Sequence, residues 1–234
     1  MKHLHRLIVN SAAYQQASAF DEKKSVIDPE NRLLWHRRPM RIESEILRDS
    51  MLAVAGTLNP VVFGPSFKPP IPAEALQARN VKDPYPRDAK DMPDTRRRTI
   101  YMFHKRVVQY PLMQAFDAPD AQQSCGRRMN TTVAPQALAL LNDPFVRLRA
   151  EELAKRLRAD AAGDSDAQIR AAFQLCLARE PARDELADAR AFISAQTVAR
   201  TQRDAKLSSS TALRVALTDF CQSLFGLNEF IYID

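Results

Sequence analysis

The polar residues best suited to chemistry gather in one segment, FDAPDAQQSCGRRMNTTVAPQALALLND, at positions 116–143. Its candidate ligand-binding side chains are Asp117, Asp120, Cys125, Arg127, Arg128, Thr131, Thr132 and Gln136. Two adjacent arginines beside a glycine could hold a carboxylate or phosphate through paired hydrogen bonds. Loops on a rigid scaffold often carry function, so the segment is a predicted binding site. The more common use of such residues, a network of ion pairs that fixes a loop against helices, stays open.

A second group of charged residues is predicted to share one helix, and its members are Arg41, Glu45, Arg48 and Asp49. Glu45 and Asp49 are four residues apart, so they lie on one helical face and could act as an acid and a base. The neighbouring arginines favour structural ion pairs instead. We keep these four residues as secondary candidates.

Other chemistry has little support in the sequence. Cys125 stands near two arginines, but a nucleophilic cysteine needs a base within reach, and the spacing of the four histidines connects none of them to it. There is no CxxC, CxxCH, HExxH, GxSxG or GxGxxG pattern. We therefore expect neither a cofactor nor a metal site in this chain, and the residues leave open whether it is an enzyme.

The elements that must position these side chains are predicted to be helices. Apolar residues at helical spacing indicate helices over residues 2–12 and 41–57, the second with a core stripe of Leu47, Met51, Val54 and Leu58. Residues 28–35 begin like a capped turn at Asp28. Beyond residue 135 the expected inward stripes are Val146, Ala150, Leu153 and Leu157; Ile169, Phe173 and Cys176; Leu186 and Ile193; and Leu213, Leu217, Phe220 and Leu224.

One stretch interrupts this helical pattern. Eight of the 15 prolines lie between Pro60 and Pro93, which is typical of an extended excursion over residues 59–95. Residues 99–103 are rich in β-formers and are predicted to be a strand. The sequence predicts a mainly α fold: an irregular helical domain over residues 1–234, with a Pro-rich extended excursion, at most a short strand or hairpin, and a helical subdomain at 134–234.

The charge pattern and the hydropathy of the sequence limit the classes of partner that the chain could bind. The net charge is +6, but the basic residues occur in pairs and triples rather than in a long tail, which indicates solvated faces and disfavours nucleic-acid binding. No run of about 18 apolar residues occurs, so we expect no membrane span. The sequence has no secretory signal pattern.

Several of these motifs together resemble a known family. The matching pieces are KHLHRLIVNSAAY, DPENRLLWHRRPMRIESEILRDSMLAVAGTL, RRTIYMFHKR, FDAPDAQQSCGRRMNTTVAPQALALLNDPFV, LARE with Pro181, and NEFIYID. They resemble the domain of unknown function 1553 family, found mainly in planctomycete proteins linked to cytochrome c-like domains. The resemblance implies the C-terminal portion of a larger family domain, and hence a fragment of a larger protein.

The family resemblance also implies a setting. Its parent proteins are often secreted or bound to the cell envelope, with a haem-binding segment and another domain upstream, whereas this chain has no haem motif of its own. The expected partner is that upstream domain or another chain. The first functional hypothesis is a structural or interaction module of an envelope-associated, cytochrome-linked bacterial protein. The alternative is a module that binds or degrades an anionic polysaccharide through residues 117–136.

Overall fold

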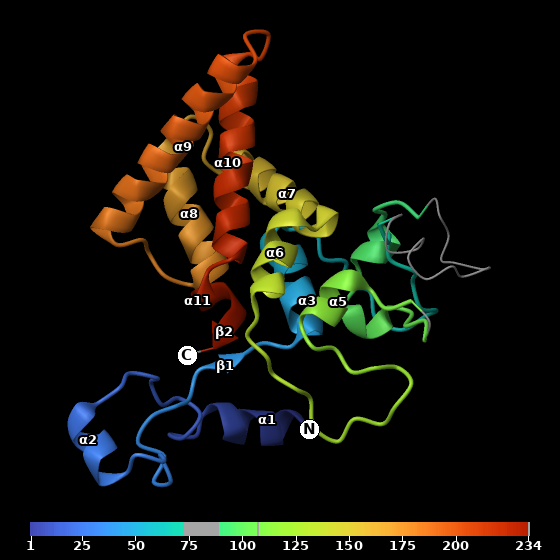
Figure 1. Cartoon of the computed structure of the whole chain (residues 1–234), viewed down its shortest axis with the longest axis vertical. Coiled ribbons are helices and arrows are strands. Elements are labelled where there is room, and N and C mark those ends of the chain that lie inside the picture. The colour runs from blue at the N-terminus through green and yellow to red at the C-terminus, as the bar shows by residue number, and fades with distance from the viewer. Residues whose placement is uncertain (73–88, 107, 234) are drawn as a thin grey trace. The chain divides into compact units, whose positions relative to one another are not determined.

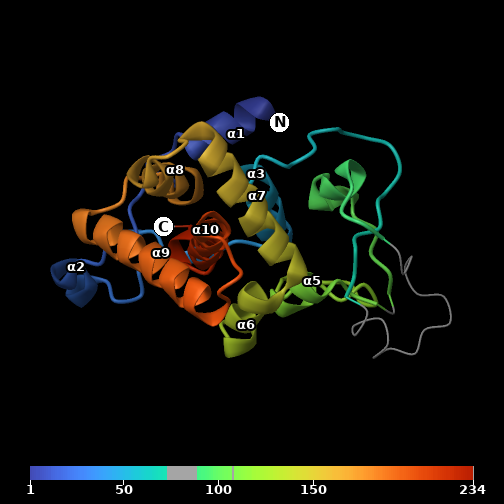
Figure 2. The same cartoon turned by 90° about the horizontal axis from the view of Figure 1, so that it is seen from above.

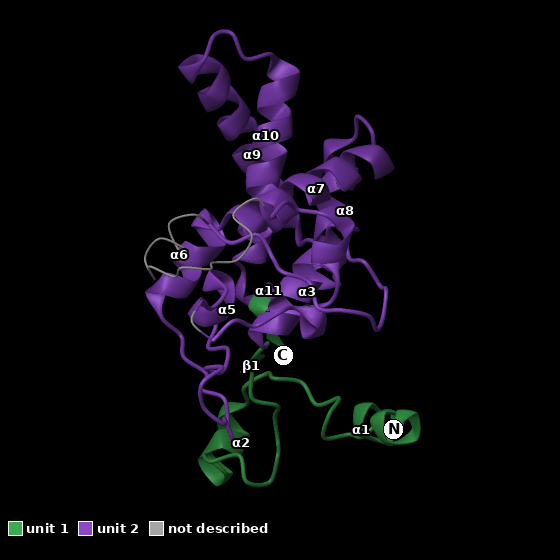
Figure 3. Ribbon diagram, turned by 90° about the vertical axis from the view of Figure 1, so that its right-hand side faces the viewer, with its two compact units in different colours: residues 1–42, 231–234 green, residues 43–230 purple. Residues whose placement is uncertain are grey.

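The computed structural model describes residues 1–72, 89–106 and 108–233, and these are mainly helical (Figures 1 and 2). Within them, the only paired strands form a two-stranded antiparallel sheet. The predicted fold class is therefore confirmed. The chain divides into two compact units, residues 1–42 with 231–234 and residues 43–230 (Figure 3). The predicted single domain, and the subdomain at 134–234, stay predictions.

The smaller unit contains two short helices, α1 (Lys2–Val9) and α2 (Glu22–Ile27). The side chain of Asp21 starts α2 by accepting hydrogen bonds from the backbone N–H groups of Lys23 and Lys24. The predicted turn at Asp28 is confirmed, because this carboxylate accepts from two backbone N–H groups within residues 28–35. Strand β1 (Met40–Arg41) pairs with β2 (Tyr232–Ile233), with Met40 opposite Ile233.

The larger unit begins with helix α3 (Ser44–Val54), whose Leu47 and Met51 are fully buried as predicted. Leu52 is also fully buried, whereas Val54 is half-buried, so the core face of α3 is rotated slightly from the predicted stripe. Helix α3 packs on α5 (Pro111–Ala115) and α7 (Pro144–Asp160). These contacts place α3 at the centre of the region that holds the candidate residues.

The C-terminal helices form the main core of the larger unit. They are α6 (Ala134–Asn142), α7, α8 (Ser165–Leu177), α9 (Arg183–Arg203), α10 (Ser209–Phe225) and α11 (Asn228–Ile231). Helices α9 and α10 lie side by side (Figures 1 and 2), and α10 also packs on α7. The predicted stripe of α7 is buried throughout. Burying a leucine side chain such as Leu153 contributes roughly 1.5–3 kcal/mol, so this stripe is a principal source of stability.

Two predictions about local structure are wrong. Residues 99–103 form no strand, because Thr99–Tyr101 is a 3₁₀ turn. The backbone N–H and the hydroxyl of Thr99 donate to the Asp49 carboxylate. Among the described residues, the strand-like backbone pairing of this segment is limited to an isolated parallel bridge between Met102 and Phe67. Leu213 was predicted to face the core of α10 but is half exposed, whereas Leu217, Phe220 and Leu224 are buried. Ala212, the neighbour of Leu213, is fully buried, so the core face at this end of α10 contains Ala212 and not Leu213.

The Pro-rich excursion at 59–95 can be followed only at its two ends, since residues 73–88 lie outside the described residues. The described part consists mainly of irregular backbone and ends in the short 3₁₀ helix Pro93–Arg96. Among the helices that the structure describes, none combines the length and apolar character needed to cross a membrane.

Candidate functional site

The predicted polar segment is a loop between α5 and α6 whose two ends are joined by hydrogen bonds. Asp117 has a left-handed backbone conformation (φ 57°). Its carboxylate accepts from the backbone N–H of Thr131 at 2.8 Å and from the Thr131 hydroxyl at 2.9 and 3.0 Å. The buried Gln136 amide donates to the Thr131 carbonyl at 3.0 Å. These three candidates therefore close the base of the loop.

A bidentate ion pair joins the same loop to helix α3. The two terminal nitrogens of Arg128 donate to the two carboxylate oxygens of Glu45 at 2.7 and 2.9 Å. Glu43 lies at 3.4 Å from Arg128. Burial alone would raise the pKa of Glu45, but the hydrogen bonds from Arg128, the backbone and Ser44, with the charge of Arg128, together outweigh it and hold this pKa below its ordinary value. One primary candidate thus contacts one secondary candidate.

The remaining primary candidates, Asp120, Cys125, Arg127 and Thr132, are exposed. Asp120 accepts from the backbone N–H of Gln122 at 3.0 Å, and Cys125 is a free thiol. Four cavities of the larger unit have linings of described residues that include none of the eight primary candidates. The structure thus places these residues on loop-closing contacts or in solvent, and their predicted ligand-binding role stays a prediction.

Of the secondary candidates, Arg48 and Asp49 hold irregular backbone in place. The buried Arg48 guanidinium donates to the carbonyls of Thr95 at 2.6 Å and Arg97 at 3.1 Å, and to the Thr99 hydroxyl at 3.1 Å. Asp49 is 3.7 Å from Arg48 and accepts from Thr99. Arg41, the fourth, is buried in β1 of the smaller unit. The structure therefore supports ion pairs and hydrogen bonds for this group.

A second buried arginine extends the network to α7. Arg149 is fully buried and donates to Asp91 at 2.6 Å and to the Thr57 hydroxyl at 2.9 Å. Asp91 also accepts from Arg96 at 2.5 and 2.9 Å. Burial would raise the pKa of Asp91, but these two arginines outweigh it and hold the pKa below its ordinary value. Two guanidinium groups therefore share this one carboxylate.

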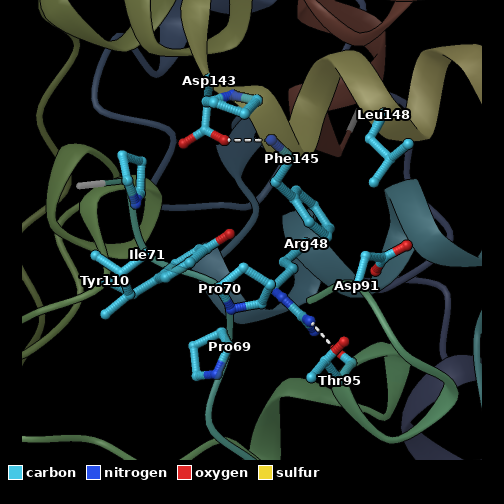
Figure 4. A pocket seen from close by; sticks show the side chains of 12 residues that line it. Arg48, Pro69, Pro70, Ile71, Asp91, Thr95, Tyr110, Asp143, Phe145 and Leu148 are labelled. Carbon is cyan, nitrogen blue, oxygen red and sulfur yellow. Dashed lines mark hydrogen bonds between the residues drawn. The ribbon is translucent and has the colours of Figure 1, made fainter. Parts of the chain in front are cut away.

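Next to this network lies a cavity of about 300 Å³. Most of its wall is apolar and comes from Pro69, Pro70, Ile71, Pro72, Pro144, Phe145 and Leu148. Polar groups of Arg48, Asp91, Thr95, Tyr110 and Asp143 complete the lining. Figure 4 shows the Tyr110 hydroxyl pointing toward the interior between Asp143 and Arg48. An apolar cavity into which a few polar groups converge is typical of a small-molecule site.

Burial changes the acidity of the two titratable groups at this cavity. It raises the pKa of the Tyr110 hydroxyl well above its ordinary value, an effect that Asp143 increases and Arg48 opposes. Burial also raises the pKa of Asp143, although the backbone N–H of Phe145 donates to it at 2.8 Å at the start of α7. Both groups therefore favour their neutral forms more than they would in water.

The other two cysteines of the chain are Cys176 and Cys221. Burial raises the pKa of Cys176 to about 12 and that of Cys221 well above its ordinary value, which makes both thiols poor nucleophiles. Across residues 1–72, 89–106 and 108–233, no group of three or more His, Cys, Asp or Glu side chains is placed to hold a metal ion.

Sequence reasoning did not single out Arg149 or Asp91, which belong to the buried network beside the cavity. One signal was present, since Arg149 lies three residues after Val146 and next to Ala150, within the apolar stripe of α7. A charge in such a position must find partners when the helix packs. Asp91 follows a Pro-rich stretch and gave no comparable signal.

Comparison with known proteins yields one match. A family model described as "Protein of unknown function (DUF1553)" matches residues 1–193. No curated protein and no solved structure shows a significant match to the chain.

Proposed function

The chain belongs to the DUF1553 family of proteins of unknown function, and we propose that it is an interaction module whose smaller unit binds another protein surface. The partner is the upstream domain of its parent protein or another chain. In this proposal the parent protein is associated with the cell envelope and linked to cytochrome c-like domains, as the family resemblance implies. This role requires no reaction by the chain itself.

The observation that supports this proposal is the exposed apolar face of α1. Leu4, Leu7 and Ile8 share one face of the helix, yet they are 53%, 57% and 48% exposed, and no residue of α1 is buried. Holding this much apolar surface in water is unfavourable by roughly 25 cal/mol per Å². A contiguous apolar face of this kind is typical of a surface that binds a protein or a membrane.

Further exposed apolar residues occur elsewhere in the same unit. They are Phe20, Val26, Ile27, Leu33 and Leu34. The backbone around them is nevertheless ordered by specific hydrogen bonds, such as the bond from the Trp35 indole N–H to the Asp28 carbonyl at 2.9 Å. A unit with a defined backbone and an uncovered apolar surface is better suited to docking than to catalysis.

Site-specific photo-crosslinking tests the proposal. A photo-reactive amino acid replaces Leu7 in the natural protein in its own cells, and a matched protein carries it at Arg6. A helix turns by about 100° per residue, so Arg6 lies away from the face that Leu4, Leu7 and Ile8 share. We expect a discrete protein adduct from position 7 and only background from position 6.

The type of adduct identifies the partner. An adduct within the same polypeptide identifies the upstream domain, and an adduct with a second polypeptide identifies another chain. Equal background at both positions would show that the face remains in water and would contradict the proposal. Adducts only with lipid would replace the protein partner by a membrane surface, which is the other known use of amphipathic helices with basic residues.

A further inference from the structure

We propose that the cavity between the Pro69–Pro72 segment and the start of α7 is a binding site for a small, uncharged aromatic alcohol of about one ring. In this arrangement the ligand hydroxyl accepts from Tyr110 and donates to Asp143. The ring packs against the prolines and Phe145. All of these residues belong to the larger unit, so the inference is independent of the proposed function of the smaller unit.

The size and the wall of the cavity favour a single flat ring. Its volume of about 300 Å³ is at the lower limit of ligand pockets in proteins. Proline rings, the ring of Phe145 and the side chain of Leu148 form most of the wall. Aromatic rings gain favourable contacts with such surfaces beyond the burial of apolar area.

The charges around the cavity favour a neutral ligand. The Arg48 guanidinium already pairs with Asp49 and donates hydrogen bonds to two carbonyls and to the Thr99 hydroxyl. Asp91 likewise already accepts hydrogen bonds from Arg96 and Arg149. The charges of Asp143 and Arg48 at the lining have opposite signs, so an anion would be repelled by the Asp143 carboxylate and a cation by the Arg48 guanidinium. A charged ligand would thus lose its hydration for little gain, which is costly. A neutral ligand avoids this cost.

Two polar groups at the cavity retain unused hydrogen-bonding capacity. Asp143 accepts a hydrogen bond from Phe145 at one carboxylate oxygen, and a carboxylate can accept several. The Tyr110 hydroxyl, which points into the cavity (Figure 4), can donate one hydrogen bond. A phenolic hydroxyl is both a donor and an acceptor, so it can satisfy Asp143 and Tyr110 together.

The Nε of Arg48 is buried and has no hydrogen-bond partner within the described residues, as is also true of the Nε of Arg149 and Arg200. Of these three arginines, only Arg48 is among the lining residues of the cavity. Such unpaired buried N–H groups cost free energy, so the polar network beside the cavity is not fully satisfied.

The test uses the full chain and three probes of nearly equal size: neutral p-cresol, anionic benzoate and cationic benzylamine. Binding is measured by saturation-transfer NMR and calorimetry at pH 7. We expect p-cresol to bind at least tenfold more tightly than either charged probe. No detectable p-cresol binding, or equal binding of a charged probe, would overturn the proposal.

Variants then locate the binding site. Leu148→Phe adds volume to the cavity wall and should abolish p-cresol binding, whereas Leu138→Phe, the same change at an exposed position of α6, should leave it unchanged. Tyr110→Phe keeps the ring but removes one hydrogen bond, so p-cresol should bind about fivefold more weakly. If Leu148→Phe does not fold, Tyr110→Phe alone tests whether p-cresol binds in this cavity. Unchanged binding to Tyr110→Phe and to folded Leu148→Phe would place p-cresol elsewhere.

Discussion

Arg128 and Glu45 form a bidentate ion pair that connects the loop between α5 and α6 to helix α3. The two hydrogen bonds, at 2.7 and 2.9 Å, join residues 83 positions apart in the sequence. Paired bonds of this kind fix direction as well as distance. The loop is therefore held at its base, by Asp117 and Thr131, and again three residues before Thr131, by Arg128.

Arg128→Ala should loosen this loop while the helices stay intact. The backbone amides of residues 121–130 should exchange hydrogen with solvent faster, and the free energy of unfolding should fall by only about 0.5–1 kcal/mol, because the pair is partly exposed. The neighbouring Arg127→Ala, at an exposed position, is the matched control. We expect it to change neither quantity measurably. Equal effects in the two variants would show that the ion pair does not fix the loop.

The same pair should make stability depend on pH in the acid range. The pKa of Glu45 in the folded protein is below its ordinary value of 4.5, so the folded state binds this proton less readily than the unfolded state does. Its contribution is therefore complete above pH 4.5 and is lost as the pH falls through the folded pKa. Glu45→Gln should lose this contribution. Urea titrations should show that the advantage of the natural protein over this variant shrinks on acidification.

Asp143 should show the opposite dependence. Burial raises its pKa above the ordinary value of 3.8, so the folded state binds this proton more readily than the unfolded state does. The stability of the natural protein should therefore fall as the pH rises from 3.8 through the folded pKa. Asp143→Asn retains a side chain that can start α7 and does not titrate. Relative to this variant, the natural protein should become less stable as the pH rises from the acid range to neutral. If the unfolding free energies of the two proteins changed in parallel with pH, that result would contradict the pKa shift.

Arg48 should be among the most sensitive positions in the chain. Arg48→Met removes the donor to the Thr95 and Arg97 carbonyls and leaves these groups unpaired, so it should cost about 3–5 kcal/mol of unfolding free energy. Arg98 also lies near Asp49, at 3.9 Å, but its side chain is 59% exposed. Arg98→Met should therefore cost no more than about 0.5 kcal/mol. Urea denaturation of both variants measures how much unfolding free energy each one loses. Similar losses would show that the burial of the arginine does not determine the cost of replacing it.

The helices were predictable from the sequence because their stability depends on local patterns. The α7 stripe and the start at Asp143 and Pro144 follow from side-chain spacing and capping alone. The exposure of Leu213 could not be foreseen in the same way, since the adjacent Ala212 is the residue that faces the core there. A periodic pattern predicts that a helix has a core face, but packing decides which of two neighbouring residues lies on it.

The candidate site was much less predictable, because it depends on contacts between distant residues. The loop at 116–136 was found from its density of polar side chains, yet its contact with Glu45 follows only from the packing of α3. Thr99–Phe103 has the composition of a strand, but Asp49 and Arg48 bind its backbone and hydroxyl groups. The cavity combines Pro69–Pro72 with the start of α7, and no local pattern relates them.

The two buried arginines that bind irregular backbone also have a consequence for the order of folding. Arg97 donates to the Val61, Phe63 and Pro65 carbonyls, and Arg48 to those of Thr95 and Arg97. These contacts span more than 30 residues, so closing the chain precedes any gain from them. We expect them to form after the rate-limiting step. Destabilising changes at Arg97 should then mainly accelerate unfolding and leave the refolding rate nearly unchanged.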